Sequence, residues 1–158
     1  MRGGAPVARL DDLGAGEARV VQAFRHWCDG PQGLATFGPA LKARFGPRRA
    51  AAALSGLDTC CRIVTGHARR PLARHSANCP CVGGDEAAFA RLCASAAAGE
   101  REDAMLIACL LVRADMAGAL AAAAEVAGLA LAVCDTTPEE ATGRPGAQPR
   151  GAAGARWH

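Results

Sequence analysis

Apolar residues that recur every three or four positions are the feature that most constrains what this chain can fold into. The clearest example comprises Val20, Val21, Phe24, Trp27 and Cys28. This spacing places the side chains on one face of an α-helix. No segment alternates convincingly between apolar and polar residues with the period of two that a half-buried strand requires. The pattern therefore predicts an all-α fold.

Stop signals and further stripes predict five to six helices. Asp29-Gly30-Pro31 ends the first helix, expected at 17–28. Residues 32–45 have helical spacing, but Gly38-Pro39 predicts either two short turns or one kinked helix. The remaining helices are expected at 47–66, at 85–98, after Gly99, and from Asp115 onward. Because the helix after Gly99 is apolar on nearly all sides, we expect it to be the central helix.

The chain of 158 residues fits one domain. Residues 1–15 are rich in Gly and Ala and are expected to be flexible, whereas 16–134 form the helical domain and 135–158 a disordered C-terminal tail. The helical pattern disappears between 67 and 84, where Pro71, Pro80, Gly83 and Gly84 interrupt it. The sequence thus predicts a single compact bundle of five to six helices with a long irregular Cys/His-containing loop after the third helix.

Composition indicates a cytoplasmic bacterial protein. The excess of Arg, Ala and Gly is typical of a GC-rich genome, and the N-terminus lacks the apolar core of a signal peptide. The most apolar run, 104–112, is too short to cross a membrane, so no membrane association is expected. Eight cysteines could form disulfides in a secreted protein, but in a reducing compartment a Cys/His cluster indicates metal binding or redox activity.

The loop at 67–84 contains the candidate site. It carries His75, Cys79 and Cys81 within seven residues, and Cys61 lies just upstream on the core-facing stripe of its helix. Zinc prefers four such ligands in tetrahedral geometry. We therefore predict a structural zinc site formed by Cys61, His75, Cys79 and Cys81, which pins the loop to the end of the third helix. Cys60 or His67 could replace one of these ligands.

Other interpretations of the same residues remain open. A Cys-Pro-Cys spacing is unusual for zinc, and thiolates also select an iron–sulfur cluster or Cu(I). Nearby arginines such as Arg74 would lower a thiol pKa, which favours a thiol-based redox protein or sensor. The loop thiols could also be ordinary surface residues, and Cys60 and Cys61 could be small core residues. The main hypothesis is a small metal-binding protein that acts as a binding or regulatory module.

Catalysis is not indicated. A carboxylate of Asp85 or Glu86 could serve a metal as a general base, but such a pair at the start of a helix is interpreted as a cap. Arginines are concentrated in the middle of the chain and could meet phosphate: Arg48, Arg49, Arg62, Arg69, Arg70 and Arg74. Because no aromatic residues lie between Gly46 and Asn78, base stacking is not expected. A protein partner is expected, with nucleic acid as the alternative.

Overall fold

Residues 4–131 are described by a computed structural model, and they form six α-helices and a two-stranded sheet. The all-α prediction, with a long loop after the third helix, is confirmed. The helices are α1 (Ala15–Cys28), α2 (Pro31–Phe45), α3 (Pro47–His67), α4 (Gly84–Ala97), α5 (Arg101–Leu111) and α6 (Ala114–Ala130). The strands are β1 (Pro6–Arg9) and β2 (Cys81–Gly83), and a short 3-10 helix follows β1 at Leu10–Asp12. The predicted tail at 135–158 lies outside the described residues.

Two Gly-Pro pairs set the boundaries of the first three helices. Gly30 and Gly46 have φ values of 74° and 80°, which L side chains rarely adopt, so the chain turns there without strain. Pro31 and Pro47 then occupy the first turns of α2 and α3, where a missing N–H breaks no helical hydrogen bond. Pro39 lies inside α2, so this segment is one helix rather than two short turns.

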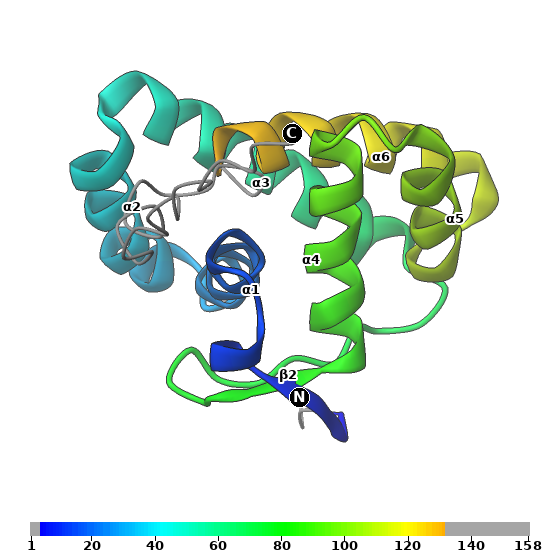
Figure 1. The fold of residues 1–158 in the computed structure, drawn as a ribbon, viewed down its shortest axis with the longest axis horizontal. Coiled ribbons are helices and arrows are strands. Elements are labelled where there is room, and N and C mark those ends of the chain that lie inside the picture. Colours follow the sequence, from blue (N-terminus) through cyan, green and yellow to red (C-terminus); the bar gives the residue numbers. More distant parts are fainter. Residues whose placement is uncertain (1–3, 132–158) are drawn as a thin grey trace, which may run out of the picture.

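Helix α4 is the central helix of the bundle. Figure 1 shows it standing between α1 and α5, with α6 crossing at one end, and it packs against all three. Its Phe89 ring lies 5.0 Å from the Phe24 ring of α1, measured between centroids. The prediction that the helix after Gly99 is central is wrong. Leu106 and Leu110 of α5 are 67% and 73% exposed, because only one side of α5 faces α4 and α6.

The N-terminal segment is more regular than predicted. Pro6–Arg9 pairs antiparallel with Cys81–Gly83, and the Leu10 N–H donates to the Pro80 carbonyl oxygen at 2.8 Å. The sequence analysis expected no strand, and the strand and 3-10 helix at residues 6–12 correct that expectation. Such short strands are held by backbone hydrogen bonds to a distant part of the chain, and they leave no side-chain periodicity to detect. The ribbon anchors the end of the loop that follows α3.

Candidate functional site

A buried ion pair between α1 and α4 lies beneath the Cys-Pro-Cys segment. Arg25 and Glu86 are both fully buried. The guanidinium donates from Nε to Glu86 Oε1 at 2.7 Å and from Nη2 to Oε2 at 3.0 Å. Arg25 also donates from Nη1 to the Cys79 carbonyl oxygen at 2.7 Å and from Nη2 to that of Cys81. One guanidinium thus binds a helix carboxylate and both cysteine backbones.

Glu86 gathers further donors from the loop. Its carboxylate accepts hydrogen bonds from the N–H groups of His75 at 2.9 Å and Gly83 at 2.8 Å, and from His75 Nδ1 at 2.9 Å. Burial alone would raise the pKa of Glu86, but the hydrogen bonds from Arg25, Gly83 and His75 outweigh it and lower the pKa to about 2. Glu86 is therefore ionised at neutral pH. We call the ion pair of Arg25 and Glu86 the latch.

Asp85 secures the earlier part of the same loop. Both oxygens accept from Arg70, at 2.8 and 2.7 Å, and the Ala73 N–H donates to Oδ2 at 2.7 Å. The hydrogen bond from Arg70 lowers the pKa of Asp85 below its ordinary value. Asp85 therefore does not cap the helix as predicted, because its side chain binds the loop. Two adjacent carboxylates hold residues 70–83, which explains how this loop is fixed by the protein's own side chains.

Cys79 and Cys81 form a pair at the surface above the latch. Both are partly exposed, and only Pro80 separates them in the chain. The neighbouring Cys79 side chain raises the pKa of Cys81, because their interaction favours the protonated thiol. The sequence prediction that these two thiols act together, as metal ligands or as a redox pair, stays a prediction.

His75 binds Glu86 and packs over Gly83, in the strand that carries Cys81. Since the Glu86 carboxylate only accepts, Nδ1 of His75 carries a hydrogen and donates it, and Nε2 is left as the second ring nitrogen. A Cβ at Gly83 would lie 3.2 Å from the imidazole Cε1, so the ring packs over Gly83. Residues 81 and 83 share a face of a strand, which places the imidazole on the Cys81 side of β2.

The structure does not bring the four predicted zinc ligands together. Cys61 is fully buried in the core with Cys60 and Cys93, and burial raises the pKa of all three thiols. The reason is topological: Cys61 lies on α3 inside the hydrophobic core, whereas Cys81 lies in β2 and Cys79 just before it. His67 ends α3 and its carbonyl oxygen accepts from the Arg113 N–H at 3.1 Å. Within residues 4–131, no cluster of three or more His, Cys, Asp or Glu side chains has the arrangement of a metal site.

The arginines predicted to meet nucleic acid mostly have internal partners. Arg62 pairs with Asp58 at 2.7 Å and Arg70 with Asp85, while Arg74 Nη1 lies 2.9 Å from Asp29. Arg49 and Arg69 donate to backbone carbonyl oxygens. A guanidinium that is already engaged gains less from a phosphate, so this surface is a weaker candidate than the sequence suggested.

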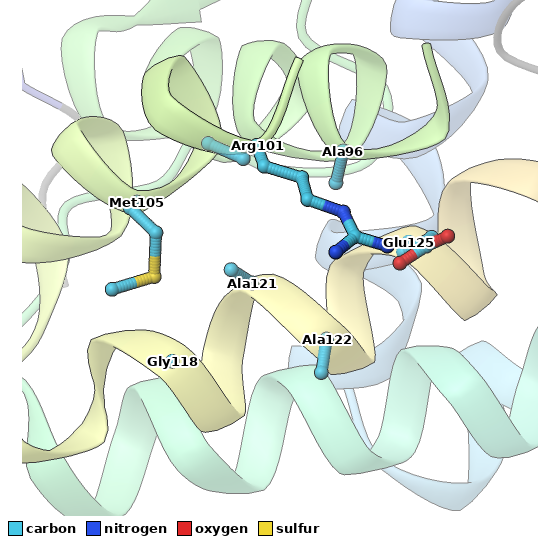
Figure 2. Close-up of a pocket in the computed structure, with 8 residues that line it drawn as sticks. Ala96, Arg101, Met105, Gly118, Ala121, Ala122 and Glu125 are labelled. Atoms are coloured by element: carbon cyan, nitrogen blue, oxygen red, sulfur yellow. The ribbon is translucent and has the colours of Figure 1, made fainter. Parts of the chain in front are cut away.

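A separate pocket lies between the end of α4, α5 and α6. Its floor is built from small residues, including Ala121 and Gly118 of α6, and its volume is about 330 Å³. Figure 2 shows Arg101 reaching across it towards Glu125. The residues that line this pocket include no thiol and no imidazole. This pocket therefore lacks the thiol and imidazole groups that are found near the cysteine pair.

The sequence reasoning missed Arg25 and gave only part of the role of Glu86, which caps α4 by accepting the Gly83 N–H and also binds Arg25 and the loop. Arg25 lies four residues after Val21 and three before Cys28, so it falls on the apolar stripe of α1. Glu86 likewise precedes the buried Phe89, Ala90 and Cys93 at helical spacing. A charged residue on a buried helix face requires an opposite charge close by. Arg25 and Glu86 could therefore have been recognised in the sequence as a candidate ion pair.

None of the helices in the described part of the chain is both long and apolar enough to span a bilayer. Comparison of the chain with protein-family models, curated proteins and solved structures found no match.

Proposed function

We propose that this chain is a small thiol-based regulatory module whose reactive element is the Cys79–Cys81 dithiol. The observation that carries the proposal is that two free, partly exposed thiols lie two residues apart and that Arg25 binds the backbone carbonyls of both. A dithiol of this kind can be oxidised reversibly to a disulfide. Formation of the disulfide would affect the rest of the fold through Arg25, which binds the backbone carbonyls of both cysteines.

The reaction is a two-electron oxidation. With hydrogen peroxide as the oxidant, the two thiols lose two hydrogen atoms and form one S–S bond, while peroxide is reduced to two water molecules. Residues two apart lie within about 7 Å between Cα atoms, at the upper end of what a disulfide spans. Closing the bond therefore requires the backbone at 79–81 to contract.

That contraction would act on the latch. Arg25 binds the carbonyl oxygens of Cys79 and Cys81 on one side and Glu86 on the other. Movement of these carbonyls changes the hydrogen bonds that hold Arg25 against Glu86, and hence those from Glu86 to His75 and Gly83. The oxidation state of the dithiol would thereby be converted into a change of loop order that a protein partner could recognise. The cytoplasm is the expected compartment, because its thiols are kept reduced.

The test is an oxidation titration of the full chain with hydrogen peroxide, followed by peptide mass spectrometry. We expect a disulfide between Cys79 and Cys81, which lowers the mass of that peptide by two hydrogen atoms and is reversed by dithiothreitol. Cys79→Ser and Cys81→Ser should each abolish it, whereas Cys109→Ser, at a partly exposed position on α5, should not. A first disulfide elsewhere, or none, would overturn the proposal.

Metal binding remains a prediction, and the hydrogen bond between His75 and Glu86 favours it. Metal-ligating histidines commonly donate their second ring N–H to a carboxylate, which leaves Nε2 for the metal. Zinc at Cys61, His75, Cys79 and Cys81, or an iron–sulfur cluster, is tested by metal analysis and a visible spectrum of anaerobically purified protein. Metal lost in Cys79→Ser and Cys61→Ala would support the four-ligand site. Metal lost only in Cys79→Ser would place it at the loop alone.

A further inference from the structure

A cavity of about 380 Å³ lies behind the loop, between the last turn of α1, the last turns of α3 and residues 68–74. Its apolar lining is provided chiefly by Phe24, Val64 and Leu72, which are nearly or completely buried. The rest of the lining includes three arginines, Arg69, Arg70 and Arg74. We call this space the arginine cavity. Its size and mostly apolar lining, with a few polar groups, are those of small-molecule sites.

Arg74 carries an unsatisfied donor at this cavity. Its Nη1 lies 2.9 Å from Asp29 Oδ1, but its Nε is buried and has no hydrogen-bond partner in the described part of the chain. A buried N–H without an acceptor costs free energy. A small turn of the guanidinium that directs Nε–H into the cavity would satisfy it with a ligand oxygen while the bond to Asp29 is kept.

The charge at the cavity is positive. Arg70 is neutralised by Asp85 and Arg74 by Asp29, whereas Arg69 donates to the neutral Cys109 carbonyl oxygen at 3.0 Å. The residues that line the cavity include no carboxylate. An anionic group is therefore favoured at its arginine side, and an apolar group on the side of Phe24 and Leu72.

We propose that the arginine cavity binds a small amphiphilic carboxylate. The carboxylate head lies against Arg74, with Arg69 supplying further positive charge, because guanidinium and carboxylate form strong charge-assisted hydrogen bonds. The hydrocarbon body lies against Phe24, Val64 and Leu72, where its burial supplies most of the affinity. A neutral or cationic molecule of the same length lacks the first of these interactions.

The test is calorimetric titration of the full chain with octanoate, octanol and octylamine. We expect octanoate to bind about tenfold more tightly than octanol, and octylamine to bind most weakly. Arg74→Gln should remove the preference for octanoate over octanol. The matched control is Arg48→Gln, which makes the same charge change at an exposed position outside the cavity and should keep the preference.

A second variant tests the location. Thr65 lines the cavity at an exposed position, and its hydroxyl only bonds its own helix, at 2.8 Å from the Cys61 carbonyl oxygen. Thr65→Trp should therefore fold normally by circular dichroism, fill the cavity and lose octanoate and octanol together. Equal binding of octanoate and octanol, binding unchanged in Arg74→Gln or Thr65→Trp, or no binding would overturn the proposal. Cys79→Ser should bind octanoate as the unaltered chain does, so this inference and the dithiol proposal fail independently.

Discussion

Among single residues, Glu86 is expected to contribute most to stability, because its buried carboxylate accepts from Arg25, His75 and Gly83. Glu86→Gln leaves Arg25 buried without a counter-charge and should lower the free energy of unfolding by about 3–5 kcal/mol. The control is Asp58→Asn, which affects an exposed pair with Arg62 and should cost less than about 1 kcal/mol. Urea denaturation at pH 7 measures both. Similar losses in the two variants would contradict the importance of the latch.

Glu86 also predicts how stability depends on pH. Its pKa is about 2 in the folded protein, against an ordinary 4.5 in the unfolded chain, so the unfolded chain binds more protons as pH falls between these values. The stabilisation, about 3 kcal/mol, is therefore complete above about pH 5 and is lost as pH falls towards 2. In urea titrations from about pH 6 to pH 3, the gap between the unaltered chain and Glu86→Gln should narrow. A constant gap would show that Glu86 does not titrate in this way.

The residues of the candidate site differ in how far the sequence could predict them. Cys79 and Cys81 are neighbours in the chain, so their proximity follows from local geometry. The distance of Cys61 from them depends on how α3 packs against α6 and α1, and no local sequence pattern predicts that packing. Arg25 and Glu86 are 61 positions apart and were recognisable only as charges on otherwise apolar helix faces.

At the scale of the helices, the close packing of α6 against α4 at Gly128 can be tested most directly. A Cβ at Gly128 of α6 would collide with the Cys93 backbone carbonyl of α4, whereas a Cβ at Gly118 of the same helix would meet nothing within 4 Å. Gly128→Ala should destabilise the protein by more than about 2 kcal/mol through strain. Gly118→Ala should instead stabilise it by about 0.5–1 kcal/mol, because alanine is the better helix former. Thermal denaturation of both variants checks this, and a neutral Gly128→Ala would contradict the packing of α4 on α6.

The elements themselves were predictable where their signals are local. Gly-Pro pairs and apolar stripes identify α1, α2 and α3 from the sequence. The position of α5 was not predictable in this way: an apolar composition does not distinguish a central helix from a peripheral one that leaves Leu106 and Leu110 exposed. The β1–β2 ribbon was missed because its pairing joins Pro6 to Gly83, and three or four residues are too few to show alternation.

For the molecule as a whole, the loop after α3 connects the thiols of Cys79 and Cys81 to the helical bundle. It is held at its start by Asp85, in its middle by Glu86, and at its end by pairing with β1. The first two of these contacts are made by the first turn of α4, the central helix, and β2 leads directly into that turn. A change confined to Cys79 and Cys81 therefore has a direct route, through Arg25, to contacts that order the whole loop.

Amide hydrogen exchange of His75 and Gly83, measured by NMR in reduced and peroxide-treated protein, tests this central claim most directly. Both N–H groups donate to Glu86 and should be protected in the reduced form. Oxidation of the Cys79–Cys81 pair should accelerate their exchange by about tenfold or more, as the local opening free energy falls by about 1.4 kcal/mol. Treated Cys79→Ser protein should show no acceleration. Unchanged exchange after the disulfide has formed would contradict the coupling between the dithiol and the latch.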